Sequence, residues 1–533
     1  MTATENPNRP RRAAWVAALL ISVVVVGLHV RLLNHAGGLW RDEVNLVNLA
    51  GHSSLADFAH DAFPVLTPLA VHCWMKIGFG QTDFGLRCLG ALVGLGILGA
   101  LWVNSWTTRR APPLLGLALF ALNSLVIIYG DSLRGYGLGS ALIVFAAAGA
   151  WAFLKNPSWS RAGIFAALAV LSVQALYQNA VLIGAICVGA FAVCGRRKLF
   201  APALKIFLTG LLAALSLLPY LPNLLAAPEN AAGLRTGFQP DVIIQNLSLA
   251  LGFPLSPYLF VWALLVVVVI FFGFAASKNE PQLFAAVTLL AALAGFGGFL
   301  WLAALPTQPW YFLPLMALVA ACFDAGLPEL PKRFWSASFG LIAATALVGA
   351  MFTRRDVELR FTNVDLLARL VARRANENDL VIVQPWYCGI SFERYFKSTT
   401  PWTTLPPLAD HSGHRYDLVH EQMKNPDALA PVLEKISTTL QSGHRVWIVG
   451  WMDVPAPDAK PPKPLPLPPL NYSGWSDTPY SIQWGAQAAL VLRDHCKNFG
   501  RAELPKTGAV NPNEELRLLV ADGWSEPTNS AAP

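Results

Sequence analysis

Two adjacent carboxylates, Asp42 and Glu43, lie in a short polar stretch that follows the first long apolar run of the chain. The apolar side chains of Leu39, Trp40 and Val44 flank them, so the stretch differs from a solvated linker. A carboxylate beside a substrate hydroxyl can take its proton as a general base, which accelerates such reactions about 10²–10⁴-fold. The pair is therefore the first candidate for catalysis. A simpler interpretation is that both acids stabilise the positive end of a helix beginning near Val44.

A second group of candidate residues lies between later apolar runs. The sequence YGDSLRGYGLGSAL contains Asp131, Arg134 and Tyr136, and LPTQPWYFLPL places Trp310 and Tyr311 at the start of another run. A charge at membrane depth costs at least about 2.5–3.5 kcal/mol, which makes Arg134 a functional candidate. The alternatives are that Arg134 anchors its helix at the membrane surface and that the two aromatic residues belong to an interfacial belt.

Metal and disulfide chemistry have weaker support in the sequence. Four histidines crowd the segment after the first apolar run without a tight ligand spacing: His35, His52, His60 and His72. The seven cysteines show no metal-ligand spacing either. Cys388 and Cys496 lie in the polar C-terminal part and could pair if that part is extracytoplasmic, although sequence alone does not show that they are close.

Composition identifies the class of protein. Of the 533 residues, 54% are hydrophobic and only 13% are charged, and the mean hydropathy is +0.46. Soluble domains carry about 25% charged residues, so most of this chain is expected to lie in a membrane. The net charge of +7 does not indicate nucleic-acid binding, because the basic residues occur in short clusters between apolar runs.

The apolar runs predict about eleven transmembrane helices, since a span needs about 20 apolar residues. The stretch 163–194 is taken as a hairpin of two spans, because one helix of that length would far exceed the thickness of the hydrocarbon core. The predicted spans are Ala13–Leu33, Leu86–Trp106, Pro113–Tyr129, Tyr136–Phe153, Gly163–Tyr177, Ala180–Cys194, Ala203–Leu221, Pro257–Phe274, Leu283–Leu305, Pro309–Phe323 and Phe334–Phe352.

Basic residues alternate between the predicted connections, which indicates the orientation of the chain. Cytoplasmic loops carry an excess of Lys and Arg, and every second connection is basic if the N-terminus is cytoplasmic. Asp42, Glu43 and everything after Arg354 then face the extracytoplasmic side. The residues on the cytoplasmic side are Arg109, Arg110, Lys155, Arg161, Arg196, Arg197, Lys198, Lys278, Lys332 and Arg333.

The C-terminal part has the character of a soluble domain. Amphipathic helices alternate with short buried strands near 379–383, 446–449 and 516–520, and a proline-rich link, Pro455 to Pro469, separates the last two. This alternation predicts a small parallel α/β domain. The expected organisation is a helical membrane domain, 1–353, followed by an extracytoplasmic α/β domain, 354–533.

The membrane part resembles the GT-C class of membrane glycosyltransferases, in the branch of the protein O-mannosyltransferases and bacterial aminoarabinose transferases. The resemblance begins with the outward acid pair after the first span and covers about Ala13 to Phe352. TPLAVHCWMKIGFGQTDFGLRCLGALVG is similar to the family's PPLYY…W…G…E…LR stretch, SLRGYGLGSAL to its ARPYAL motif, and PWYFLPLMALVA to its RYLLPALPAL motif. Trp310 stands where the family has arginine, and VLTP replaces its paired prolines.

This resemblance implies an inverting transfer of a sugar from a polyprenyl-phosphate donor to a hydroxyl of a glycan, lipid or protein acceptor. Asp42 would be the general base, and Glu43 would orient the acceptor or Asp42, or help hold a divalent cation. Arg134 would stabilise charge on the leaving phosphate, with Tyr136 and Tyr311 lining the donor groove. The expected location is the bacterial inner membrane, with the C-terminal domain outside the cytoplasm.

Two other classes of function remain possible from the sequence. A polytopic transporter or lipid flippase would line a pathway with ionisable groups such as Arg31, but charges deep within the spans are scarce and no internal repeat is visible. A non-catalytic assembly protein would use its C-terminal domain to recruit partners. Cleavage of the donor by the purified protein distinguishes the enzyme from both.

Overall fold

The computed structural model describes residues 9–52, 58, 63–222, 237–252, 256–275, 279–304, 306–328, 335–453, 455–456, 462–463, 465–468, 475–504 and 508–526. His60, Lys278, Lys332, Arg333 and much of the proline-rich link lie outside these ranges.

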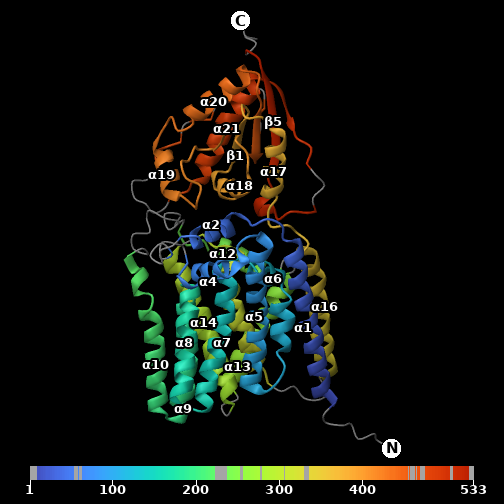
Figure 1. Cartoon of the computed structure of the whole chain (residues 1–533). Coiled ribbons are helices and arrows are strands. Elements are labelled where there is room, and N and C mark those ends of the chain that lie inside the picture. Colours follow the sequence, from blue (N-terminus) through green and yellow to red (C-terminus); the bar gives the residue numbers. More distant parts are fainter. Residues whose placement is uncertain are drawn as a thin grey trace, which may run out of the picture. The chain divides into compact units, whose positions relative to one another are not determined.

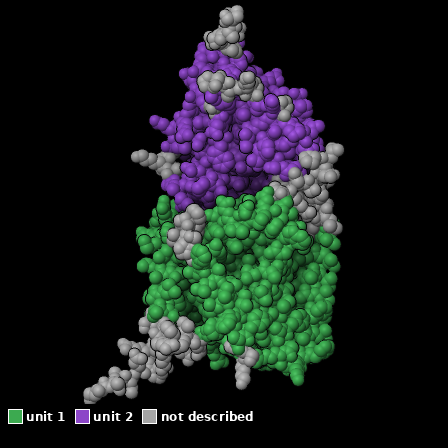
Figure 2. Space-filling view, turned by 180° about the vertical axis from the view of Figure 1, so that it is seen from behind, with its two compact units in different colours: residues 1–35, 52–224, 237–358 green, residues 36–51, 225–236, 359–533 purple. Residues whose placement is uncertain are grey.

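The chain divides into two compact units, coloured separately in Figure 2. The helical unit comprises Met1–His35, His52–Leu224 and Gly237–Glu358, and the sheet unit comprises Ala36–Gly51, Leu225–Thr236 and Leu359–Pro533. After the last membrane segment, the boundary between the two units falls between Glu358 and Leu359. The segment 36–51, which carries the acid pair, groups with the sheet unit rather than with the membrane helices around it in the sequence.

Nine segments among the described residues are long and apolar enough to cross a membrane. This confirms the expected polytopic membrane protein with a C-terminal soluble domain. The nine segments are built on α1 (Arg9–His35), α5 (Asp83–Arg109), α7 (Gly135–Lys155), α9 (Asn179–Arg197), α10 (Phe200–Leu215), α13 (Ser256–Ala275), α14 (Glu280–Ala303), α15 (Leu313–Gly326) and α16 (Trp335–Asp356).

Two predicted spans look different in the structure. The stretch 163–194 is a hairpin, as expected, but its first helix, α8 (Trp159–Ala175), has only 17 residues. The predicted span Pro113–Tyr129 is broken into a π-helical piece, η2 (Gly116–Ala121), and α6 (Ser124–Gly130). Asn123 lies at the break, where its side chain accepts from the Leu125 backbone N–H at 2.8 Å. Hydropathy does not detect this cap, so the break in the segment was not predicted from the sequence.

Helix α7 occupies the centre of the helical unit and packs against α5, α8, α9 and α15 (Figure 1). Its sequence GSALIVFAAAGAWAF is rich in small residues, which allow neighbouring helices to approach closely in a membrane. The same principle applies where α9 meets α14, because a Cβ on Gly189 would lie 2.0 Å from the Thr288 hydroxyl oxygen.

Shorter helices lie between the long ones. Helix α4 (Leu66–Trp74) continues into a π-helical turn, η1 (Met75–Phe79), and Gly78 in that turn has a φ of 102°. Residues 66–79 therefore form a short kinked helix. The others are η3 (Leu218–Tyr220), α12 (Pro240–Gly252) and η6 (Pro309–Phe312).

Basic side chains gather at one end of the helical unit. Lys155 at the end of α7 donates to the Thr107 carbonyl, and Arg161 near the start of α8 donates to the Ala152 carbonyl at 3.0 Å. Arg197 at the end of α9 donates to Glu280 at 2.7 Å. Arg134 precedes the opposite end of α7, which has 21 residues and is therefore about 30 Å long. The charged end and the Arg134 end thus lie on opposite sides of the bundle.

The sheet unit consists of five described strands with helices around them (Figure 1). The strands are β1 (Leu380–Gln384), β2 (Trp402–Thr404), β3 (Val446–Gly450), β4 (Cys496–Arg501) and β5 (Arg517–Trp524). The helices are α2 (Arg41–Ala50), α17 (Val364–Arg374), η8 (Trp386–Cys388), α18 (Gly389–Tyr395), α19 (Tyr416–Lys424), α20 (Ala430–Gln441), α21 (Thr478–His495) and η9 (Pro512–Glu514).

The sheet is mixed, and this corrects the expectation of a parallel one. The strand order is β2-β1-β3-β5-β4. β1 pairs in parallel with β2 and β3, whereas β5 is antiparallel to both β3 and β4. β4 starts directly after α21 in the sequence CKNFGR, and it was not predicted because it lacks a buried apolar run. β5 then returns antiparallel to β4 and inserts beside β3.

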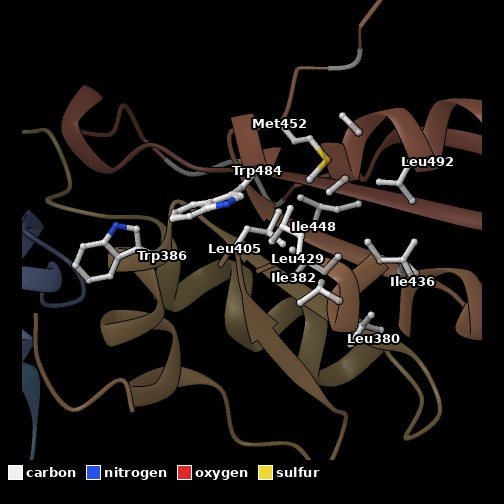
Figure 3. Packing of buried hydrophobic residues seen from close by; sticks show 14 of the residues in the cluster. Leu380, Ile382, Trp386, Leu405, Leu429, Ile436, Ile448, Met452, Trp484 and Leu492 are labelled. Atoms are coloured by element: carbon white, nitrogen blue, oxygen red, sulfur yellow. The ribbon is translucent and has the colours of Figure 1, made fainter. Parts of the chain in front are cut away.

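Fully buried strands form the centre of the sheet unit. All five residues of β1 and of β3 are buried, as expected for strands covered on both faces. Figure 3 shows one face of this core, where Ile382 and Ile448 pack with Trp484 and Leu492 of α21. The other face is covered by α17 and α18. This rigid sheet supports the loops that hold the acid pair.

Candidate active site

The segment before the acid pair is fitted tightly to the sheet unit. Gly37 has a φ of 73°, and a Cβ there would lie 2.5 Å from the Arg360 guanidinium carbon. A Cβ on Gly38 would lie 2.9 Å from the Asp365 side chain. Arg360 and Asp365 form an ion pair at 2.9 Å. The glycine pair in GGLWRDE therefore allows the chain to pass directly over this ion pair.

A buried ion pair fixes the start of α2. The backbone N–H of Arg41 donates to Glu514 Oε2 at 3.1 Å, and its guanidinium lies 3.3 Å from the same oxygen. Glu514 is fully buried and also accepts from the hydroxyls of Ser391 and Thr362, at 2.9 and 3.1 Å. Burial raises the pKa of Glu514, and the positive charge of Arg41 opposes this shift. The carboxylate thus has donors that compensate for its desolvation.

Asp42 contacts a histidine from a distant part of the sheet unit. Nε2 of His414 donates to Oδ1 of Asp42 at 3.1 Å. Arg41 Nε lies 3.8 Å from the same oxygen. The Asp42 side chain remains 20% exposed, so the carboxylate is held in place without being sealed from a substrate.

Glu43 occupies a different environment from its neighbour. It is fully buried, and its Oε2 lies 3.4 Å from the backbone nitrogen of Trp40, at the third position of α2. A glutamate at this position commonly reaches back to the residue that caps a helix. The helix-cap interpretation therefore fits Glu43, whereas Asp42 points to His414.

The helical unit brings the other three candidates together around an aromatic ring, Phe63. The Arg134 guanidinium lies 4.4 Å from the Phe63 ring centroid. The Tyr136 ring meets Phe63 edge-on at 5.4 Å and stacks with Tyr311 at 5.7 Å. The carbonyl of Tyr311 accepts from Gln178 at 2.7 Å. Arg134, Tyr136 and Tyr311, which are far apart in the sequence, thus share one end of the bundle.

The residue that replaces the family's arginine is part of the same aromatic group. Trp310 stacks on Tyr129 with ring centroids 4.4 Å apart and an interplanar angle of 26°. It meets Tyr311 nearly edge-on at 6.4 Å. Here an indole stacked on a phenol takes the place of a positive charge. Among the sequence-predicted residues gathered here, Arg134 is the cationic one.

A buried pair in the helical unit was not predicted as a unit. Nδ1 of His29 in α1 lies 2.8 and 2.9 Å from the two carboxylate oxygens of Asp131. Both side chains are buried. The sequence analysis noted Asp131 but not its partner, because His29 is a single polar residue within an apolar helix. A polar residue inside a span was the available signal.

The histidine-rich loop does not form a metal site in the part of the chain that the structure describes. Nδ1 of His35 donates to the Arg31 carbonyl at 2.9 Å, and His72 packs beside Phe58. No group of three or more His, Cys, Asp or Glu side chains there could hold a metal ion. The seven cysteines are free thiols, so Cys388 and Cys496 are not paired.

The predicted residues therefore fall into two groups. Asp42 and Glu43 belong to the sheet unit, and Arg134, Tyr136 and Tyr311 belong to the helical unit. Sequence reasoning missed Phe63, His414 and Glu514, which hold members of these groups in place. No periodic pattern marks them. Each is an isolated residue whose partner is remote in the sequence.

The described helices and sheet define a polytopic membrane protein with a soluble α/β unit. No protein-family model matches the chain, and no curated protein matches it in sequence. Its fold is similar to that of ArnT from Cupriavidus metallidurans, solved bound to undecaprenyl phosphate. The TM-score is 0.50 and the identity 12%, over 82% of this chain and 92% of ArnT. For the apo state of ArnT, the TM-score is 0.49 and the identity 13%, over 82% of this chain and 93% of ArnT.

An archaeal structure shows a weaker likeness. The oligosaccharyltransferase of Archaeoglobus fulgidus, tethered with an acceptor peptide, aligns with 96% of this chain and 75% of its own length. The TM-score is 0.48 and the identity 11%. TM-scores below 0.5 support no further inference. At 12% identity the likeness to ArnT establishes the fold, so the resemblance inferred from the sequence is confirmed at that level.

Proposed function

We propose that this protein transfers a sugar from a polyprenyl-phosphate donor to an acceptor hydroxyl at the extracytoplasmic face of a bacterial inner membrane. The observation that carries the proposal is Asp42, a partly exposed carboxylate held by His414. It follows the first membrane helix of a chain with the ArnT fold. The undecaprenyl phosphate bound to ArnT supports a lipid-phosphate donor for this chain as well.

In the proposed reaction Asp42 takes the proton of the acceptor hydroxyl as its oxygen attacks the anomeric carbon of the donor. The new carbon–oxygen bond forms as the bond to the phosphate oxygen breaks, and the polyprenyl phosphate leaves with that electron pair. Attack from the face opposite the leaving group inverts the anomeric centre. Because the phosphate is already a good leaving group, the protein needs chiefly a base and a positive group.

The other candidate residues have supporting roles in this proposal. Arg134 stabilises the charge that develops on the leaving phosphate through charge-assisted hydrogen bonds. Tyr136 and Tyr311, stacked on each other, form a wall of the donor groove. Glu43 keeps the first turn of α2 in place, as its contact with the Trp40 backbone suggests.

The proposed orientation is supported by charge. The basic ends of α7, α8 and α9 gather on one side of the helical unit, which the positive-inside rule assigns to the cytoplasm. The Arg134 end of α7 and the sheet unit then belong outside. The acceptor is accordingly a glycan, lipid or protein of the cell envelope.

Release of the lipid carrier tests the proposal. Purified full-length protein would be incubated with undecaprenyl-phosphate-linked sugars and an envelope extract from cells lacking the protein, which supplies the acceptor. Mass spectrometry would follow free undecaprenyl phosphate and the sugar-bearing product. We expect release of undecaprenyl phosphate together with one new glycosylated species. Movement of intact donor across vesicles without cleavage would instead identify a flippase.

A further inference from the structure

We infer that His414 is a positioning residue for transfer, which sets the orientation of the Asp42 carboxylate and makes the sheet unit a working part of the enzyme. This inference rests on the proposed function, because it concerns the residue proposed as base. It assigns a task to the C-terminal domain, whose role the sequence left open.

The first support is the way the His414 loop is attached to α2. The backbone N–H of His414 donates to Asn45 Oδ1 at 3.0 Å, and the side chain of Asn48 donates to the Ser412 carbonyl at 2.9 Å. Asn45 lies about one turn from Asp42 on α2, and Asn48 lies about one turn beyond Asn45 on the same face. The loop and the helix are thus joined at two points besides the Asp42 contact.

The second support is the stiffness of the loop itself. Asp410 Oδ1 accepts from the Ser412 backbone at 2.8 Å, and the other carboxylate oxygen accepts from Arg415. Arg415 also donates to Asp417 at 2.7 and 2.9 Å. These bonds close the turn 410–417 on itself. A loop so restrained can hold a side chain at a fixed place, which catalysis by orientation requires.

The third support is the packing of the imidazole ring. The ring of His414 lies 5.9 Å from that of Tyr416, at an angle of 24°, and meets Trp386 edge-on at 6.4 Å. Trp386 is itself anchored through its indole N–H, which donates to Asp477 at 2.7 Å. The ring therefore cannot turn freely, and Nε2 is directed at Oδ1 of Asp42.

The geometry of the His414 ring indicates that His414 positions Asp42 and does not itself take the proton of the acceptor. If His414 were the base, one of its nitrogens would have to face the acceptor hydroxyl. Nε2 is occupied by Asp42. Nδ1 is buried and has no hydrogen-bond partner among the described residues. Asp42, with its partly exposed side chain, is the group that can reach a substrate, and His414 acts through it.

Three substitutions at position 414 test the inference, because they differ in whether and where they present a hydrogen-bond donor to Asp42. His414→Gln puts an amide N–H near the position of Nε2. His414→Asn puts it near the position of Nδ1, too short to reach Asp42. His414→Ala removes it. Asn45→Ala and Asn48→Ala are matched controls, since they loosen the same loop without touching the Asp42 contact. All variants would be purified as full-length protein and checked by thermal unfolding.

The readout is the rate of undecaprenyl phosphate release at varied donor concentration. We expect His414→Ala and His414→Asn to lower kcat about tenfold to hundredfold, since a displaced catalytic group costs that much. The donor KM should stay within about twofold, because His414 does not touch the donor, and His414→Gln should recover most of kcat. Asn45→Ala and Asn48→Ala should lose clearly less kcat than His414→Ala, because they loosen the loop but leave the Asp42 contact in place.

Several results would overturn the inference. Wild-type kcat in His414→Ala would do so, as would equal losses in His414→Gln and His414→Ala. An equal loss in Asn45→Ala would mean that the loop matters only as a structural clamp. These failures are distinct from failure of the proposed function. In that case the wild-type protein would release no undecaprenyl phosphate, or Asp42→Asn would stay active.

Discussion

Arg41 and Glu514 lie 473 positions apart in the sequence, yet the Arg41 guanidinium is 3.3 Å from the Glu514 carboxylate in the structure. Arg41 immediately precedes the acid pair, and Glu514 lies three positions before the start of β5. The contact ties α2 to the sheet unit. The residue proposed as base is thus held by a domain that the sequence places at the far end of the protein.

The first prediction concerns this pair. Glu514→Ala removes the fully buried partner of the half-buried Arg41 charge, and breaking a buried pair costs at most about 3–5 kcal/mol. We expect a lower unfolding temperature and loss of sugar transfer, measured by thermal unfolding and by release of undecaprenyl phosphate. Glu515→Ala, an exposed neighbour, is the control and should match the wild type. Equal stability of the two variants would contradict the proposed anchor.

The second prediction concerns Arg134. If it contacts the donor phosphate, Arg134→Ala should weaken binding of undecaprenyl phosphate and lower turnover together. Arg134→Lys should recover only part of the binding and of the turnover, because lysine keeps the charge but loses the planar fork of hydrogen-bond donors. Arg161→Ala, at the opposite end of the bundle, should leave binding unchanged. Wild-type turnover in Arg134→Ala would favour the anchor interpretation instead.

The third prediction concerns pH and the sheet unit. Asp379 is buried, which raises its pKa, but donors from Trp447 Nε1 and the backbones of Arg445 and Asn376 outweigh this, so the pKa lies below its ordinary value. A lowered pKa means that ionised Asp379 stabilises the fold above about pH 4 and that this stability is lost as pH falls through the folded pKa.

Asp379→Asn should therefore lower the unfolding temperature at pH 7, by an amount corresponding to about 1–3 kcal/mol. The difference from the wild type should shrink as the pH is lowered below about 4. Thermal unfolding of the full-length protein followed by tryptophan fluorescence measures both, with the exposed Glu377→Gln as control. A difference that is constant with pH would be inconsistent with the ionised carboxylate as its source.

The fourth prediction concerns orientation. A reporter that is active only outside the cytoplasm, fused after Arg360 or after Pro533, should be active. The same reporter fused after Arg197, at the basic end of α9, should be silent because that end is expected in the cytoplasm. The reverse pattern would place the acid pair on the cytoplasmic side and would remove the proposed extracytoplasmic reaction.

Much of the helical unit could be predicted from sequence because membrane spans are long and uniform in hydropathy. The hairpin α8–α9 followed from length and charge, and it is present. The break at Asn123 within the predicted span Pro113–Tyr129 was missed, because it depends on one local hydrogen bond that hydropathy does not detect. The family resemblance implied that Tyr136 and Tyr311 lie in one groove, and the two rings stack in the structure.

The sheet unit was predictable only in part. β1 and β3 were found because continuous apolar runs mark buried strands. The direction of β5 depends on which strand it joins, and pairing partners leave no local pattern in a single sequence. The same reason explains why His414 and Glu514 were missed. Each contacts α2 across more than 370 positions, and only the folded chain brings them there.

Asp42 itself allows the most direct test of the proposed reaction. Asp42→Asn keeps the size of the side chain and most of its hydrogen bonding but cannot take a proton at neutral pH. We expect it to abolish release of undecaprenyl phosphate while expression, unfolding temperature and binding of undecaprenyl phosphate stay near wild type. Glu43→Gln should cost less, since Glu43 is buried and supports α2.

The helix-cap interpretation predicts a different result at Asp42: the Asn variant should be nearly silent and the Ala variant should lose stability. If Asp42 only stabilises the helix end, Asn would serve about as well as Asp, and Asp42→Ala would lose roughly 0.5–2 kcal/mol of stability. The decisive measurement is therefore the rate of undecaprenyl phosphate release by purified Asp42→Asn protein. A folded, donor-binding and inactive variant is the predicted result, and turnover at the wild-type rate would contradict the assignment of Asp42 as the base.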